Sequence, residues 1–169
     1  MRRLLEVLYS ISAALAAFFM CAIGVLILSQ TIGRPLGVVV PDANEMAGFC
    51  FAAITFLALA PTFRAGGHIR VTLFTSKLPR VVQRWLEILT LVVALGLVAY
   101  LAWWTVDLAR GSYAYHDVSP GVLAFPLWIP QAAMAFGLIM MTVCIAEILF
   151  DVVRGEPAPY HGKEGEVSE

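Results

Sequence analysis

The third of four apolar runs in this chain reads Trp85-Leu-Glu-Ile-Leu-Thr-Leu-Val-Val-Ala-Leu-Gly-Leu-Val-Ala-Tyr-Leu-Ala-Trp-Trp-Thr-Val-Asp-Leu108, and its two charged residues stand near its ends. A helix needs about 20 mostly apolar residues to cross a bilayer. Runs of this kind cover about 8–32, 45–63, 82–109 and 125–150. With 60% hydrophobic residues, 14% charged residues and a mean hydropathy of +0.84, 169 residues cannot form a water-soluble domain. The sequence predicts an all-α integral membrane protein with four transmembrane helices in one domain, 1–155.

The first run follows two arginines but is too long for a signal peptide, whose apolar region has about 7–15 residues, so we expect a retained helix. Basic residues favour the cytoplasmic side of a membrane. Nine of the eleven fall on one side if the connectors alternate: Arg2, Arg3, Arg64, Arg70, Lys77, Arg80, Arg84, Arg154 and Lys163. The other two are Arg34 and Arg110. We therefore expect both termini in the cytoplasm, with 156–169 as a cytoplasmic polar tail.

The connector between the second and third runs combines charge, paired glycines and a histidine in Pro61-Thr-Phe-Arg-Ala-Gly-Gly-His-Ile-Arg-Val-Thr-Leu-Phe74. Apolar and polar residues alternate over about 68–78, which favours a short amphipathic interfacial helix. Gly66 and Gly67 allow the sharp change of direction before it. We expect Arg64, His68 and Arg70 to hold this turn at head-group level in contact with membrane lipids. A ligand role is the alternative for His68.

The middle of the predicted bilayer holds no ionisable residue, since none falls near Met20, Thr55, Leu97 or Leu138. Residues that relay protons or bind ions in a membrane are costly there and mark function when present. Their absence argues against an autonomous pump. Nearer the ends, we expect Glu87 and Glu147 to pair with Arg84 and Arg154 along their helices, with contact to a partner subunit as the alternative.

The second run has a start signal, because Asp42 precedes it and Glu45 follows three residues later, a spacing typical of an N-cap with a capping-box acid. Gly48 and Ala52 have the spacing that allows close helix approach. The three cysteines are single and lie within the runs, and the three histidines lie outside them. Neither a thiol oxidase nor membrane haem ligation fits this distribution. We expect no enzymatic activity and no cofactor.

Two motifs in this four-run chain resemble a known family. One is Arg64-Ala-Gly-Gly-His-Ile-Arg-Val71, preceded by Glu45 and followed by Leu78-Pro79. The other is Ser119-Pro-Gly-Val-Leu-Ala-Phe-Pro-Leu-Trp-Ile-Pro130 before the last run. Their order and spacing resemble the small permease subunit, of DctQ type, of tripartite ATP-independent periplasmic (TRAP) transporters.

The resemblance implies a scaffold subunit in the bacterial inner membrane. Its partners would be a large TRAP permease subunit, which carries the transport sites, and a periplasmic solute-binding protein that delivers a carboxylate-bearing solute for ion-driven uptake. Residues expected to contact the large subunit are Glu45, Gly48, Ala52 and Glu87. Residues expected to help dock the binding protein are Tyr113, Tyr115, His116 and Asp117, with a merely solvated loop as the alternative. The rival class is a stand-alone membrane protein, either a self-associating exporter or the anchor subunit of a redox complex.

Overall fold

The computed structural model describes residues 2–65 and 79–155. Its helices are α1 (Arg2–Gly33), α2 (Ala43–Leu57), α3 (Leu59–Arg64), α5 (Arg80–Ala114) and α6 (Trp128–Arg154), with a short 3₁₀ turn at Arg34–Leu36. No strand occurs in the described part of the chain, which confirms the all-α class. Four segments are long and apolar enough to cross a membrane, as predicted: Leu5–Leu36, Ala43–Arg64, Val81–Ala114 and Trp128–Arg154. The interfacial arm at 68–78 and the tail at 156–169 lie outside the described residues.

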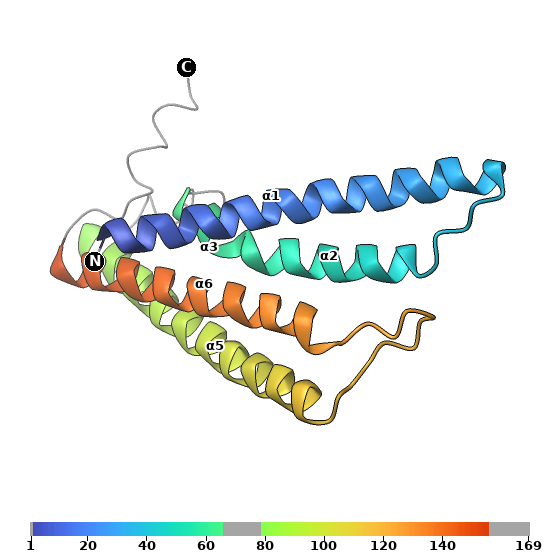
Figure 1. Cartoon of the computed structure of the whole chain (residues 1–169). Helices are drawn as coiled ribbons and strands as arrows, with labels where there is room; N and C mark the ends of the chain where they lie inside the picture. The colour runs from blue at the N-terminus through green and yellow to red at the C-terminus, as the bar shows by residue number, and fades with distance from the viewer. Residues whose placement is uncertain (1, 66–78, 156–169) are drawn as a thin grey trace, which may run out of the picture.

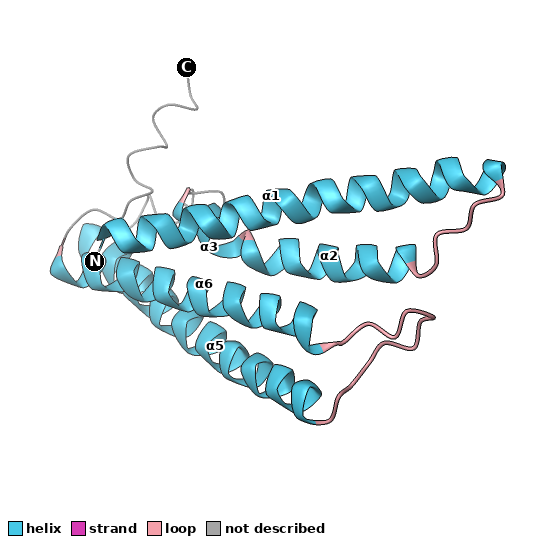
Figure 2. Ribbon diagram, viewed as in Figure 1, coloured by secondary structure: helices cyan, strands magenta, loops and turns pink. Residues whose placement is uncertain are grey.

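The helices form two antiparallel hairpins, α1 with α2 and α5 with α6 (Figure 1). α6 lies between α5 on one side and α2 and α3 on the other. α1 and α5 begin, and α3 and α6 finish, at one end of the molecule, which we call the terminal end. The connections 37–42 and 115–127 lie at the opposite, loop end (Figure 2). Both described chain ends therefore share one side, as the predicted topology requires, and the sidedness relative to the cytoplasm stays a prediction.

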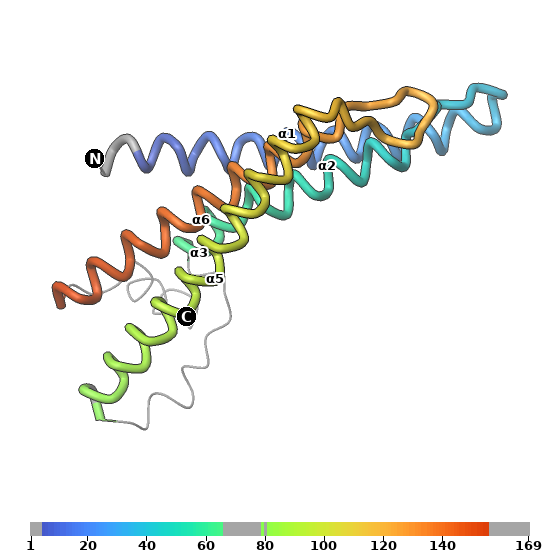
Figure 3. The backbone as a smooth tube through the Cα atoms, turned by 90° about the horizontal axis from the view of Figure 1, so that it is seen from below, coloured from blue at the N-terminus to red at the C-terminus, as the bar shows by residue number. Residues whose placement is uncertain are grey.

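α5 is longer than a bilayer is thick. Its 35 residues extend for about 52 Å at 1.5 Å per residue, against a hydrocarbon core of about 30 Å. Figure 3 shows α5 inclined to α1 and α2. A helix of this length must tilt in the bilayer or protrude from it.

The second apolar run forms two helices instead of one continuous helix, because the helical pattern is interrupted at Ala58. Proline has no N–H, so Pro61 cannot donate the helical hydrogen bond to the carbonyl of Leu57, four residues earlier. Ser12 of α1 donates its hydroxyl to that carbonyl oxygen at 2.6 Å. Ser12 is fully buried and Leu57 nearly so. A side chain of α1 thus satisfies a polar group that would otherwise face an apolar interior.

The core is built around α6, which supplies more than half of the main cluster of buried side chains. That cluster comprises Tyr9, Ala60, Leu91, Met140, Met141, Cys144, Ile145, Ile148 and Val152. Gly137 brings α6 against α2, since a Cβ at this position would overlap the carbonyl of Phe56 and lie 2.9 Å from the nitrogen of Leu57. α1 and α5 keep large apolar side chains exposed along most of their length, as helices that face hydrocarbon do.

Candidate functional site

At the terminal end, Arg64 at the end of α3 contacts charged and aromatic groups from two other helices, α1 and α6. Its Nη2 lies 3.8 Å from the carboxylate of Glu6 on α1, and its Nη1 lies 3.8 Å from the carboxylate of Glu147 on α6. The guanidinium also stacks over the ring of Tyr9, 5.0 Å from the centroid, and the Tyr9 hydroxyl donates to Glu147 at 3.4 Å. We call these four residues the Arg64 cluster.

The Arg64 cluster is a cross-helix anchor. Both the Arg64 and Glu147 side chains are more than two-thirds buried, so their attraction is less screened than that of a surface pair. The 3.8 Å separations leave Arg64 Nη1 without a hydrogen-bond partner among the described residues. The sequence had placed Arg64 at head-group level, and the structure adds that it holds α3 against α1 and α6.

The predicted pairing of Glu147 with Arg154 along α6 is wrong, because Glu147 pairs with Arg64 instead. Arg154 stacks on the ring of Phe150, 4.0 Å from the centroid. Arg84 of α5 reaches across to the last turn of α6 and donates to the carbonyl oxygens of Val152 and Val153 at 3.3 and 3.0 Å. The Val152 carbonyl also accepts the backbone N–H of the C-cap Gly155 at 3.1 Å, so Arg84 adds a second cap, supplied by the neighbouring helix, to the end of α6.

At the loop end, Asp42 and Glu45 contact the 115–127 connection between α5 and α6. Asp42 occupies the N-cap position of α2, with φ 53, but its side chain makes no capping hydrogen bond, contrary to expectation. Its Oδ2 accepts a hydrogen bond from the backbone N–H of Leu123 at 2.6 Å. Gly121 sits so close to both acids that a Cβ there would overlap Glu45 Oε2 and lie 2.7 Å from Asp42 Oδ2. The two acids therefore join the α1–α2 hairpin to the α5–α6 connection.

The connection itself is a closed loop. The Ser119 backbone N–H donates to the Phe125 carbonyl at 2.9 Å, and the Phe125 N–H donates to Ser119 Oγ at 3.2 Å. Phe125 stacks on Phe49 of α2 with ring centroids 5.7 Å apart. Ser119 is almost fully buried, so the serine in this motif shapes the loop instead of meeting solvent.

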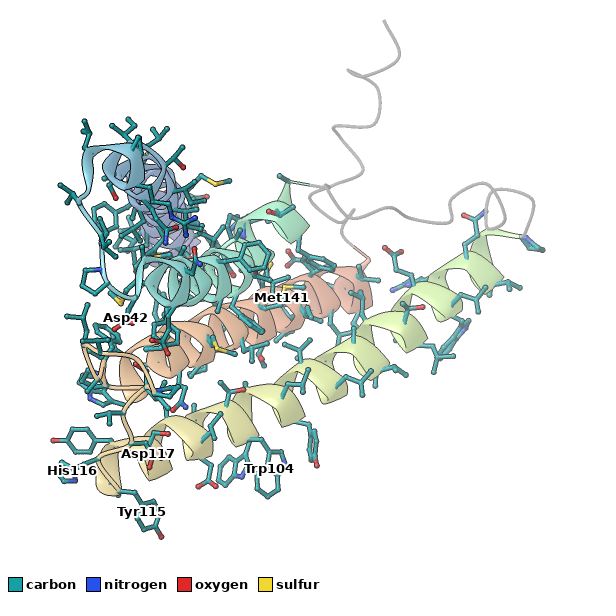
Figure 4. All side chains as sticks on the ribbon, turned by 90° about the vertical axis from the view of Figure 1, so that its right-hand side faces the viewer. Asp42, Trp104, Tyr115, His116, Asp117 and Met141 are labelled. Atoms are coloured by element: carbon teal, nitrogen blue, oxygen red, sulfur yellow. The ribbon has the colours of Figure 1, made fainter. Side chains whose placement is uncertain are left out.

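The four residues predicted to dock a binding protein lie together at the loop end; Figure 4 labels three of them. All four are exposed, Tyr115 most of all at 82%. Tyr113 packs edge-on against Trp128 at 5.6 Å. The backbone of Asp117 is fixed by hydrogen bonds to Ser112 and Leu127, each of 3.0 Å. This surface is fully accessible, and its role stays a prediction.

The remaining predicted residues are not brought together. Gly48 is exposed on α2, and a Cβ built there would meet nothing within 4 Å. Ala52 is half-buried on the same helix, whereas Glu87 is half-buried on α5 toward the terminal end, far from Glu45. Gly66, Gly67, His68 and Arg70 lie outside the described residues. Contact of these residues with a large subunit or with lipid remains untested.

Sequence reasoning missed Ser12, Tyr9 and Gly137. Pro61 was the available signal for Ser12, because a proline within an apolar helix leaves a carbonyl that needs a donor. Which helix provides that donor depends on packing. Within 2–65 and 79–155, no group of three or more His, Cys, Asp or Glu side chains could hold a metal ion. The site thus consists of two polar anchors, one at each end of an apolar bundle.

Comparison with known proteins agrees with this architecture. Residues 23–155 match the family model described as tripartite ATP-independent periplasmic transporters, DctQ component. The chain is also similar to the isethionate TRAP transporter permease protein DctMQ of Oleidesulfovibrio alaskensis, with 30% identity over 142 residues. The alignment covers 80% of this chain and 22% of that protein, so the chain spans about a fifth of the relative's length. The chain belongs to the DctQ-component family of TRAP transporters and is a small permease subunit.

Proposed function

We propose that this subunit is a fixed scaffold for a large TRAP permease subunit in the bacterial inner membrane. In this proposal the large subunit binds and moves the solute, which carries a carboxylate and is delivered by a periplasmic binding protein. An ion gradient, with sodium as the coupling ion, drives uptake. The DctQ family match carries the proposal, and the following observations support the division of labour.

The first supporting observation is the distribution of charge. No charged residue occurs in 7–33, 46–63, 88–106 or 127–146, the central parts of the four spanning segments. Transport of an organic anion or an ion across the bilayer needs polar groups near its middle. A chain without charged groups there is suited to support a transport domain and not to be one.

The second observation is that polar anchors join the elements at both ends. The Arg64 cluster joins α1, α3 and α6, and the Asp42 contact joins the two hairpins at the loop end. Such ion pairs and hydrogen bonds between helices favour a rigid subunit that keeps its shape while a partner subunit moves against it.

The third observation is the relative DctMQ, whose name assigns it to isethionate transport and of which this chain matches about a fifth. The remaining four-fifths of that protein leave room for a large permease part in the same polypeptide. For the present chain we propose a large permease partner of the same kind. Isethionate is a sulfonate, so uptake assays should test sulfonates as well as carboxylates.

The decisive experiment is co-expression of this chain with a large TRAP permease encoded beside it. We expect the two to purify as one complex, and we expect proteoliposomes to take up solute only with both subunits, the binding protein and an inward sodium gradient. Uptake by the large subunit alone at the full rate would refute the scaffold role. A stand-alone exporter or redox anchor would purify without such a partner, and the exporter would transport by itself.

Docking of the binding protein on the exposed loop-end surface has its own test. Reversal of charge in Asp117→Lys, with Arg110 retained, should reduce uptake when the binding protein is limiting and spare it at saturation. The matched control is Arg154→Glu, a charge reversal at an exposed residue of the terminal end that lies outside the Arg64 cluster. Unchanged uptake at limiting binding protein would remove this surface from the proposal without affecting the scaffold role.

A further inference from the structure

A groove runs between α5 and α6 in the half of the hairpin nearer the loop end. It comprises two adjoining cavities of about 400 and 330 Å³, and both are lined by Val106, Arg110 and Ile139. The first continues to Tyr113 and Ala132 toward the loops. The second continues to Ala99, Trp103 and Val143 toward the middle of the helices. Apart from Asp107, Arg110 and Thr142, the lining is apolar, with one tyrosine hydroxyl at its end.

The length of the groove matches one leaflet. Ala99 and Arg110 are eleven residues apart on α5, which is about 16 Å along a helix. Half of a hydrocarbon core is about 15 Å. When Ala99 is near the midplane, Arg110 is therefore at the level of the head groups, where amphipathic rings such as Trp103 and Tyr113 commonly lie near the interface.

Two opposite charges stand at that level. Asp107 and Arg110 are one turn apart on α5 and both line the groove. In the described part of the chain, neither side chain forms an ion pair or a hydrogen bond, and they do not pair with each other. A cation and an anion left open beside an apolar channel complement a head group that carries both signs. A guanidinium suits a phosphate, and a carboxylate accepts hydrogen bonds from a primary ammonium.

We propose that this groove binds one zwitterionic phospholipid with a primary ammonium, of phosphatidylethanolamine type, in the leaflet at the loop end. Arg110 receives the phosphate and Asp107 receives the ammonium. An acyl chain fills the cavity between α5 and α6 down to Ala99. The site goes beyond the scaffold role, and it can be tested on this chain whether or not that role holds. Bound lipid would complete the α5–α6 interface where protein side chains leave it open.

The experiment is native mass spectrometry of the full-length chain in detergent, titrated with palmitoyl-oleoyl phosphatidylethanolamine, phosphatidylcholine or phosphatidylglycerol. We expect the first to bind in a 1:1 ratio and most tightly, because a quaternary ammonium cannot donate to Asp107. Arg110→Gln should weaken binding of all three about tenfold, through loss of a charge-assisted contact. Arg110→Lys should largely restore it. Asp107→Asn should lower phosphatidylethanolamine binding to the level of phosphatidylcholine.

The matched control is Arg154→Gln, which removes an arginine from the opposite end of the same hairpin. Equal losses in Arg154→Gln and Arg110→Gln would show non-specific binding around the protein and would overturn the proposal. So would unchanged binding in both Arg110→Gln and Asp107→Asn. If Arg110→Gln fails to fold, the other two variants still test the proposal. Arg110→Lys should keep most of the lipid binding, and Asp107→Asn should lower phosphatidylethanolamine binding to the level of phosphatidylcholine. A photo-crosslinker at Val106 that captures the large permease, with lipid released on complex formation, would assign the groove to a protein helix instead.

Discussion

Substitution of Ser12 by alanine tests whether the hydrogen bond across the break in the second span stabilises the bundle. The hydroxyl of Ser12 donates to the Leu57 carbonyl at 2.6 Å, and both residues are buried. Pro61 cannot provide the usual helical donor, so the alanine variant leaves a carbonyl short of its partner in an apolar interior. An unsatisfied buried group costs about 1–3 kcal/mol in general. Hydrogen bonds between membrane helices average about 0.6 and reach about 1.7 kcal/mol.

We therefore expect Ser12→Ala to lower the free energy of unfolding by about 1–1.7 kcal/mol, the upper part of the membrane range, because the bond is short and fully buried. The assay is reversible unfolding in mixed micelles with increasing sodium dodecyl sulfate, followed by circular dichroism. Ser10→Ala is the matched control, because Ser10 lies on the same helix and its hydroxyl bonds only to Glu6 within that helix in an exposed position.

A second background sharpens the test. Pro61→Ala restores an N–H to the second span, so Ser12→Ala should cost less in that background than in the natural chain. Equal losses of stability from Ser12→Ala and Ser10→Ala would refute the reasoning. An undiminished cost of Ser12→Ala beside Pro61→Ala would show that the proline does not create the need for Ser12.

Three further predictions concern helix contacts and can be read from the same unfolding assay. Gly137→Ala should destabilise the bundle by about 1–3 kcal/mol through overlap with α2, whereas Gly96→Ala, on an open helix face, should stabilise it by up to about 1 kcal/mol; equal effects would contradict the close approach. Glu147→Gln should cost about 1–3 kcal/mol, and adding Arg64→Gln should cost less than the sum of the single changes; strict additivity would rule out the ion pair. Arg84→Gln should lower stability by about 1 kcal/mol and speed amide exchange in the last turn of α6; unaltered exchange there would disprove the cap.

The number of helices long and apolar enough to span a membrane could be predicted because apolar length is a local property of the sequence. Contacts between helices were harder. Glu147 and Arg154 are seven residues apart, farther than the three or four residues that favour pairing along one helix, and Glu147 pairs with Arg64 from another helix. Asp42 has the sequence context of a cap, yet its carboxylate serves the distant amide of Leu123. In both cases a partner brought close by the tertiary fold replaced the local one.

The predicted docking surface and the anchors differ in the same way. Tyr113, Tyr115, His116 and Asp117 were chosen because they fall in a polar connection, and their exposure followed from that position. Ser12 gave no such signal, since a serine within an apolar run commonly bonds to a carbonyl of its own helix and needs no partner elsewhere. Only the packing of α1 on α2 shows which carbonyl it serves.

The central position of α6 has a consequence for biogenesis. α5 rests almost wholly on α6, and α2 and α3 also pack against it. Of these four spans α6 leaves the ribosome last, so α5 is inserted before its main packing partner exists. Until then the membrane holds one paired hairpin and one solitary helix. The four helices can therefore pack together only after α6 has been synthesised and inserted. A nascent chain arrested before Trp128 should be a substrate for membrane quality control.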